Sequence, residues 1–418
     1  MAQRIRWRVL ERIGILIAIM LALFLWFGPG IVEGSMNKVV PVIKLDGHPL
    51  IDKIISPAWS LHQKLQIVDM HADTLMWQRD LLQYSKHGHI DLPRLMEGNV
   101  ALQIFSSVTK TPKGQNYDAN AGDTDNITLL AMTQLQPVRT WNSLLQRSLW
   151  HATKLARAVA QSDGNLRAVR TQADLAVLLK DRSQWTEDFP AENRRIRIEG
   201  SHRSTPVGAL LSIEGLQDLE GKRSNLDVLF KAGFRMAGFA HFYDNDVAGS
   251  MHGMKKGGLT PLGRQILADM EAKGMVVDIA HASHVAVADI LKLAKRPVVS
   301  SHGGVQATCK VNRNLTDDEI KGVARTGGVV GIGYWEGAIC STQPAKFAEA
   351  VAHVRDLVGI DYVGLGSDFD GATTTGFDTS QLALITQALM DRGFTDADIA
   401  KVMGGNVLRV LGEVLPAK

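Results

Sequence analysis

Eight short apolar runs, separated by polar or helical stretches, form the main pattern of the chain. They cover residues 66–71, 99–105, 207–213, 233–240, 274–280, 297–301, 327–334 and 361–367. Near-continuous apolar runs of this length are typical of parallel strands that are buried on both faces. Because helical patterns lie between many of these runs, the sequence predicts a (β/α)8 TIM-like barrel, with an open doubly wound sheet as the alternative.

Several predicted helices have recognisable ends. Thr260 and Pro261 begin one that stops at Gly274, and Thr316 with Glu319 forms a capping box that opens another. Further helices are expected at 345–357, 380–391 and 395–403. Residues 106–206 break the alternation, because polar tracts there surround a long helical pattern near 127–162. We interpret this region as an insertion in a catalytic barrel that spans residues 65–418.

The N-terminal region predicts a membrane anchor. Residues 13–32 carry no charge and are long enough, as a helix, to cross a hydrocarbon core of about 30 Å. A cleaved signal peptide is the alternative, but no small-x-small cleavage site follows the apolar stretch. Arginines precede the span and few basic residues follow it, which favours a cytoplasmic segment 1–12 and a catalytic domain outside the cytoplasm. In a Gram-negative cell this domain would be periplasmic. Residues 33–64 would form a juxtamembrane lead-in to it.

Composition narrows the function classes. With 418 residues and 45% hydrophobic content, the chain can bury a large core. The net charge of +3 is already reached by the arginines and the one glutamate before residue 13, so the remaining chain is balanced. This balance argues against nucleic acid as the main partner. The two cysteines, Cys309 and Cys340, could pair in an oxidising compartment or remain two buried thiols, and their spacing alone does not decide.

Most of the predicted strands end in an imidazole or a carboxylate. The residues are His71, Asp73, Glu214, His241, His281, His302 and Asp368. In an extended chain, side chains two residues apart point to the same side, which predicts that the first two lie together. Each residue alone has a structural explanation, as a loop cap or a hydrogen-bonded histidine. Together, at one rim of a barrel, they would be costly to bury without a compensating cation.

Imidazole and carboxylate ligands suit Zn²⁺, or less often Mn²⁺, Fe²⁺ or Co²⁺, and the lack of cysteine among them argues against a purely structural zinc. The set is too large for one tetrahedral ion that keeps an open position. Two metal ions that share a bridging carboxylate would accommodate it, with a bridging water made acidic enough to attack at neutral pH.

At this point the motifs resemble a known family. "VDMHADTLMW", "SIEG", "GFAHFYDNDVAGS", "GLTPLGRQILADMEAKGMVVDIAHAS", "PVVSSHGG", "NRNLTDDEI" and "VGLGSDFDG" are similar, in this order, to the motifs of the membrane (renal-type) dipeptidases, peptidase family M19, and more to bacterial than to mammalian members. The resemblance covers roughly residues 65–415. It implies a barrel of the amidohydrolase type that binds two zinc ions and hydrolyses dipeptides.

The resemblance also implies roles for individual residues. His71 and Asp73 would bind the first zinc, His281 and His302 the second, and Glu214 would bridge both.

Three further residues would contact the substrate. His241 would hold the developing oxyanion. Arg313 would clamp the carboxylate of the dipeptide, a task suited to the paired donors of a guanidinium, whereas the plain alternative is a surface arginine. Asp368 would be the acid/base that moves the proton from the bridging water to the leaving amine.

Some neighbouring residues remain ambiguous. Asp69 shares a predicted face with His71 but lies deeper in the strand, so we interpret it as barrel interior rather than a ligand. Asp370 could be mistaken for the acid/base, although the strand-end position favours Asp368. His252 lies in a glycine-rich loop, where it would line the pocket or be solvated. Because mammalian members carry a cysteine pair in comparable places, the resemblance also implies a disulfide between Cys309 and Cys340.

The sequence therefore predicts an anchored, externally facing dizinc dipeptidase, for which the family allows a D-residue at the second position, β-lactam hydrolysis and a homodimer. Two features depart from the family: residues 106–206 are longer, and the anchor is N-terminal instead of a C-terminal lipid. The alternatives are another two-metal amidohydrolase, such as a lactonase, deaminase or β-lactam hydrolase, and an anchored binding protein without turnover.

Overall fold

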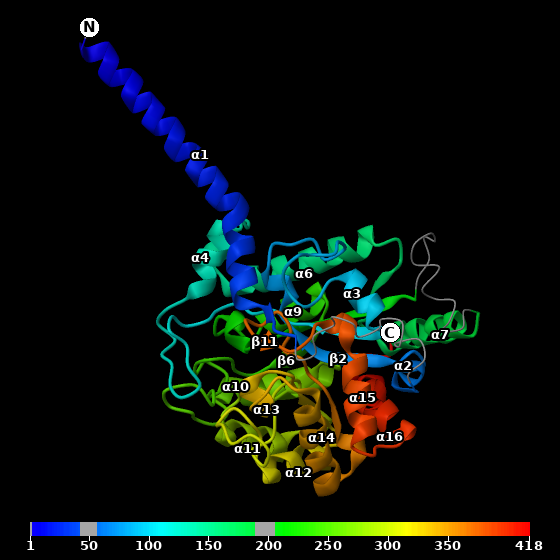
Figure 1. The fold of residues 1–418 in the computed structure, drawn as a ribbon. Helices are drawn as coiled ribbons and strands as arrows, with labels where there is room; N and C mark the ends of the chain where they lie inside the picture. The colour runs from blue at the N-terminus through cyan, green and yellow to red at the C-terminus, as the bar shows by residue number, and fades with distance from the viewer. Residues whose placement is uncertain (1, 42–56, 189–204) are drawn as a thin grey trace.

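Eight parallel strands close into a barrel in the computed structural model, which describes residues 2–41, 57–188 and 205–418 (Figure 1). The barrel strands are β2 (Ile67–Ala72), β3 (Val100–Phe105), β5 (Val207–Ile213), β6 (Phe234–Gly238), β7 (Val276–Asp278), β8 (Val298–Ser300), β9 (Val329–Ile332) and β10 (Val363–Leu365). Each pairs with the next in this order, and β10 pairs with β2 to close the ring. The predicted barrel is confirmed, and each predicted strand overlaps one of these strands.

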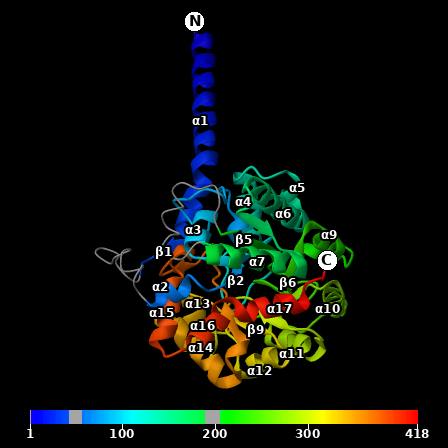
Figure 2. The ribbon, with the colours of Figure 1, turned by 90° about the vertical axis from the view of Figure 1, so that its right-hand side faces the viewer.

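Helices follow most of the strands and surround the barrel (Figures 1 and 2). They are α2 (Pro57–His62), α3 (Leu92–Glu97), α9 (Asn225–Ala232), α10 (Pro261–Lys273), α11 (His284–Leu293), α12 (Asp317–Arg325), α13 (Glu336–Ile339), α14 (Pro344–Val358), α15 (Ala383–Asp391), α16 (Asp396–Ala400), the π-helical turn Lys401–Gly405 and α17 (Asn406–Val414).

The predicted helix ends are present. The Thr260 hydroxyl accepts a hydrogen bond from the amide of Gly263 at the start of α10, and Gly274 ends that helix with a left-handed φ of 69°. Thr316 and Glu319 form the reciprocal capping box at the start of α12. Such caps satisfy backbone groups that a helix leaves unpaired, which explains why short-range sequence signals locate both helices.

The region between β3 and β5 contains α4 (Asn126–Thr133), α5 (Arg139–Asn142), α6 (Leu144–Gln161), α7 (Gln172–Asp188) and the short strand β4 (Leu166–Ala168), which pairs with β5 outside the barrel ring. The expectation of one long helical pattern near 127–162 was wrong, because the structure divides it into three helices. Leu135 adopts a left-handed φ of 51°, and Pro137, which has no amide hydrogen, lies between α4 and α5. Residues 189–204 of this predicted insertion lie outside the described residues.

The N-terminal helix α1 (Ala2–Met36) projects away from the barrel, with the N-terminus at its far end (Figures 1 and 2). By length and composition, its segment Arg6–Met36 is sufficient to cross a membrane, a criterion that a signal sequence near the N-terminus also meets. The helix is longer at both ends than the predicted span 13–32. Residues 42–56 of the predicted lead-in lie outside the described residues.

The end of α1 packs against the barrel domain. Strand β1 (Lys38–Val39) follows the helix directly and pairs in parallel with β11 (Thr374–Thr375), which lies beyond β10 in the sequence. The segment that follows α1 therefore pairs with the segment that follows β10, although the two lie far apart in the sequence.

Candidate metal centre

Seven side chains from the carboxyl ends of the barrel strands converge in one buried group. They are His71 near the end of β2, Asp73 just after that strand, Glu214 after β5, His241 after β6, His281 after β7, His302 after β8 and Asp368 after β10. The closed parallel barrel brings these residues together because all its strands end on the same rim.

Glu214 is the centre of the group. Its Oε1 atom lies 3.0 Å from Nε2 of His281, 3.3 Å from Nε2 of His302, 3.5 Å from Nε2 of His241 and 3.6 Å from Nε2 of His71. One carboxylate oxygen therefore faces four imidazole nitrogens, which is an arrangement suited to a shared metal ligand.

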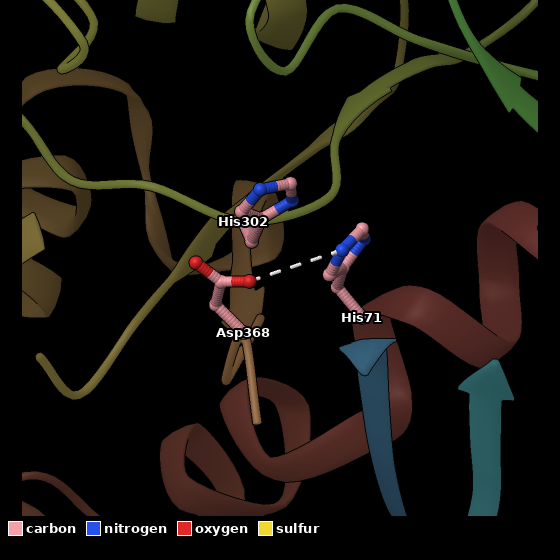
Figure 3. A group of neighbouring side chains, drawn as sticks. All are labelled: His71, His302 and Asp368. Carbon is pink, nitrogen blue, oxygen red and sulfur yellow. Dashed lines mark ion pairs between the residues drawn. The ribbon is translucent and has the colours of Figure 1, made fainter. Parts of the chain in front are cut away.

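His71 forms the second part of the group. Its Nε2 atom lies 3.4 Å from Oδ1 of Asp73 and 4.0 Å from Oδ1 of Asp368. Figure 3 shows the side chains of His71, on β2, and of His302 and Asp368, on the loops after β8 and β10, facing one another. The rings of His71 and His302 stack with their centroids 3.8 Å apart.

The spacing of His71 and Asp73 has a different cause from the one predicted. Strand β2 ends at Ala72, and Asp73 has a non-extended backbone with φ of −97° and ψ of 23°. The pairing of β2 with β3 also shifts in register between Asp69 and Ala72. The two ligand candidates meet because the strand is irregular and then turns, whereas simple strand alternation does not describe this segment.

The ionisable side chains of this site favour the binding of a cation. Burial would lower the pKa of His71, but Glu214 and Asp73 together raise it well above the usual value. Burial would raise the pKa of Glu214, but His241 and His71 hold it well below the usual range. Burial also lowers the pKa of His281 and of His302, so these imidazoles keep a lone pair available. A divalent cation fits this combination of anionic carboxylate and neutral imidazoles.

Orphaned polar atoms support the same conclusion. Among the described residues, these buried atoms have no hydrogen-bond partner: Nδ1 and Nε2 of His71, Oδ1 of Asp73, Oε2 of Glu214 and Nδ1 of His241. Buried polar groups are normally hydrogen-bonded, so such a cluster calls for an unseen partner. Three sets have ligand atoms within 4.8 Å of one another: His71, Asp73 and Glu214; Glu214, His241 and His281; and His71, His302 and Asp368. Glu214 and His71 each belong to two of the three sets, so the residues offer overlapping groups of ligands for metal.

Supporting residues orient the histidines. His281 Nδ1 lies 3.1 Å from His252 Nε2, and His252 Nδ1 lies 2.9 Å from the carbonyl oxygen of Tyr117. His252 is fully buried, so it neither lines the pocket nor is solvated but stands behind a ligand candidate. Such partners fix the ring and tautomer of a metal-binding histidine.

His302 has a comparable support that the sequence reasoning missed. Its Nδ1 atom lies 2.9 Å from Ser301 Oγ, which donates a hydrogen bond of 2.6 Å to Asp278. The signal was present, because Ser301 directly precedes the histidine and Asp278 ends the neighbouring strand β7. Neither residue type stood out as a metal ligand.

The ambiguous aspartates are separated by their contacts. Asp69 Oδ1 accepts hydrogen bonds from the amides of His71 and Ser367, so it ties β2 to the end of β10. Asp370 accepts a 2.7 Å hydrogen bond from the Thr74 hydroxyl and belongs to none of the three ligand sets. Both aspartates therefore hold the chain around the candidate metal centre in place, and neither is one of its candidate ligands.

A cavity of about 1310 Å³ opens from the centre. Its lining includes Asp73, Glu214, His241, Arg313 and Asp368. Pockets for small molecules commonly measure about 300–1,000 Å³, so there is room for a substrate beside the metal ligands.

Arg313 is buried at this cavity, which excludes the reading as a surface arginine. Its guanidinium stacks 4.6 Å from the ring centre of Trp335, and its Nη2 atom lies 3.9 Å from Oδ2 of Asp368. Burial raises the pKa of Asp368 well above the usual value.

Cys309 and Cys340 form a disulfide, and Arg313 lies in the chain segment between these two cysteines.

Comparisons with known proteins agree with this architecture. A sequence model of the membrane dipeptidase family, peptidase family M19, matches residues 55–418. The chain is 28% identical over 380 residues to the dipeptidase aclJ of Aspergillus oryzae, covering 86% of this chain and 80% of the relative.

Two solved structures share the fold. An amidohydrolase from Pseudomonas aeruginosa aligns with a TM-score of 0.61 at 18% identity, over 86% of this chain and 99% of that one. A metallo peptidase from Rhodobacter sphaeroides, liganded with a phosphinate mimic of the dipeptide L-Ala-D-Ala, aligns with a TM-score of 0.63 at 22% identity, over 84% of this chain and 99% of that one.

Proposed function

Because the chain belongs to the membrane dipeptidase family, peptidase family M19, we propose that it is a zinc-dependent dipeptidase with two ions. His71 and Asp73 would hold one ion, His281 and His302 the other, and Glu214 both. The observation that carries this proposal is the position of Glu214 Oε1, within 3.6 Å of four imidazole nitrogens.

The bound ions would supply Lewis acidity, which would polarise the peptide carbonyl and make a water acidic enough to attack at neutral pH. The protein's own groups then position the substrate and move the proton. His241 lies 3.5 Å from Glu214 and lines the cavity, where a neutral imidazole can donate a hydrogen bond to the carbonyl oxygen as negative charge develops on it.

Asp368 is the acid/base of this proposal. Its carboxyl group lines the cavity, and its two oxygens lie 4.0 Å from His71 Nε2 and 3.9 Å from Arg313 Nη2. From this position it accepts the proton released by the attacking water and returns it to the nitrogen of the leaving amine.

Arg313 selects the substrate length. A guanidinium offers paired donors that match a carboxylate, and stacking on Trp335 fixes the plane of the group. A free carboxylate held there places the preceding peptide bond at the centre, so a chain that is one residue longer would leave its carboxylate out of register.

The preferred substrates in this proposal are dipeptides, including those with a D-residue at the second position. Support comes from the Rhodobacter sphaeroides metallo peptidase, which shares the fold and was liganded with a mimic of L-Ala-D-Ala. The cavity volume of about 1310 Å³ supports a proposal of this breadth.

We further propose that α1 anchors the enzyme with its N-terminus in the cytoplasm and the barrel outside. Arginines before the apolar stretch favour this orientation. The disulfide between Cys309 and Cys340 is consistent with an oxidising compartment.

The direct test is to purify the full chain in detergent, measure its metal content and assay L,L- and L,D-dipeptides beside matching tripeptides. We expect about two zinc ions per chain and cleavage of dipeptides with tripeptides spared. Equal hydrolysis of both lengths would contradict the clamp, and protein without bound metal would contradict the dizinc centre. Turnover of lactones or β-lactams alone would favour another two-metal amidohydrolase, and metal binding without any turnover would favour a binding protein.

A further inference from the structure

The loop that carries Asp368 has an unusual backbone. Asp368, Asp370 and Ala372 all adopt left-handed conformations, with φ of 56°, 64° and 61°. Residues other than glycine rarely adopt this conformation, and they keep it only when surrounding contacts hold them there. The position of the proposed acid/base therefore depends on what ties down residues 368–375.

One group of polar contacts to this loop comes from the segment that follows β2. The amide of His89 donates a 2.6 Å hydrogen bond to Oδ1 of Asp370, and the Thr74 hydroxyl donates a 2.7 Å bond to Oδ2. The indole of Trp77 donates to the carbonyl oxygen of Asp370 at 2.7 Å. Arg79 pairs with the same carboxylate. These contacts fix the middle of the loop.

A second group of hydrogen bonds to this loop comes from the N-terminal segment. The side-chain oxygen of Asn37 accepts a hydrogen bond of 2.8 Å from the amide of Ala372. Directly afterwards, the amide of Lys38 donates to the carbonyl oxygen of Thr373 at 3.1 Å, and β1 continues as a parallel partner of β11. The end of α1 thus holds the second half of the loop.

Glu33 connects these two groups of contacts. Its Oε1 atom accepts a 2.5 Å hydrogen bond from Nε of Arg79, the arginine that also pairs with Asp370. Glu33 is only 3% exposed and Asn37 only 4% exposed, although most described side chains of α1 are exposed. A buried carboxylate is costly unless it is paired, so this arrangement is a specific contact rather than an incidental one.

The same helix borders the substrate cavity. Phe24, Gly28, Val32 and Met36, spaced by four residues along one face of α1, belong to the cavity lining together with Glu214 and other residues of the centre. The end of α1 therefore lies against both the substrate cavity and the loop of Asp368.

We propose that Glu33 and Asn37 are positioning residues for Asp368, so that the end of the N-terminal helix is part of the catalytic unit. This inference rests on the proposed dipeptidase function and on the proposed role of Asp368. It implies that a chain cut after α1 loses catalytic rate as well as its anchor.

The test uses the full chain in detergent and four variants. Asn37→Leu removes the acceptor for Ala372 at similar size, and Glu33→Leu removes the partner of Arg79. Asn37→Asp keeps an acceptor oxygen and loses an amide nitrogen that has no hydrogen-bond partner among the described residues. It also adds a carboxyl group to a buried site, so its metal content and thermal unfolding midpoint are measured beside its rate. Ser35→Ala is the matched control, because Ser35 lies in the same turn, is exposed and donates its hydroxyl hydrogen to the carbonyl oxygen of Val32 within the helix.

We expect Asn37→Leu and Glu33→Leu to lower kcat at least about tenfold, since small misplacements of catalytic groups have effects of this size or larger. KM, metal content and the thermal unfolding midpoint should stay near wild type, and Asn37→Asp and Ser35→Ala should retain most of the rate. Amide hydrogen exchange in 368–375 should become faster in the two leucine variants only.

Wild-type kcat in both leucine variants would overturn the inference. A rate loss in either leucine variant that is matched by lost metal or lost folded protein would also overturn it, because that indicates a general structural role. So would an equal rate loss in Asn37→Leu and in an Asn37→Asp variant that keeps its metal content and thermal unfolding midpoint. If the wild-type chain cleaves no dipeptide, the proposed function fails instead. Unchanged exchange in 368–375 would still refute the positioning of the loop in that case.

Discussion

Replacing Arg313 by methionine tests the part of the mechanism that restricts cleavage to dipeptides. Methionine keeps much of the apolar length of the side chain and its contact with Trp335, but it removes every donor. The guanidinium is buried, stacks 4.6 Å from the indole ring centre and lies beside Asp368, so it is already oriented before the substrate binds.

The structure sets the expected magnitude. Hydrogen bonds to a charged partner contribute about 1.5–3 kcal/mol each, and a guanidinium can donate two to one carboxylate. Losing both costs at least about 3 kcal/mol, which corresponds to a hundredfold or larger fall in kcat/KM at about 1.4 kcal/mol per factor of ten. Because the clamp contacts a group that does not react, most of the effect should appear in KM.

The assay compares a free dipeptide with the same dipeptide as its C-terminal amide. Wild-type enzyme should prefer the free acid by at least about a hundredfold, and Arg313→Met should lose that preference while cleaving the amide about as well as the wild type does. Arg355→Met is the matched control, because Arg355 also stacks on an aromatic ring, 4.5 Å from the centre of Phe394, but lies on α14. If Arg313→Met slows the acid and the amide equally, the guanidinium acts on Asp368 and the clamp is refuted.

The other predictions concern the centre and the stability of the barrel. Asp368→Asn should lower kcat by about 10²–10⁴ with the metal content unchanged, and loss of metal on elemental analysis would make this residue a ligand. Glu214→Gln should lose metal and activity together, and a variant that retained two ions would contradict the shared ligand. Burial raises the pKa of Asp218 to about 7, so between about pH 4 and pH 7 the folded chain holds a proton that the unfolded chain has lost, and its contribution to stability falls as the pH rises. Asp218→Asn should therefore raise the thermal midpoint relative to wild type at pH 8 but not at pH 4, and an equal effect at both would argue against the shift. Replacing Cys309 and Cys340 by alanine should cost about 3–4 kcal/mol of unfolding free energy for a loop of this length, measured by denaturant titration against the oxidised wild type, and an unchanged midpoint would count against the bond.

The strands and helix ends could be predicted from the sequence because their causes are local. An apolar run predicts a buried strand wherever it lies, and the caps at Thr260 and Thr316 involve residues within one helical turn. Strand ends on one rim of the barrel bring these side chains together, so the candidate ligands could be proposed from the sequence.

The two failures have different causes, the first non-local and the second local. Alternation within β2 did not describe His71 and Asp73, because the register with β3 shifts and the chain turns at the strand end. The helical pattern near 127–162 divides around Pro137.

What the sequence by itself determined is the kind of fold, the residues available to bind metal and the apolar character of the N-terminal helix. Only the tertiary structure decided that His252 supports His281, that Asp370 serves the loop of Asp368, and that Asn37 contacts Ala372, which is 335 residues away in the chain. Such contacts follow from how the closed barrel brings distant segments together, and no local pattern of hydrophobic and polar residues encodes which of them will meet.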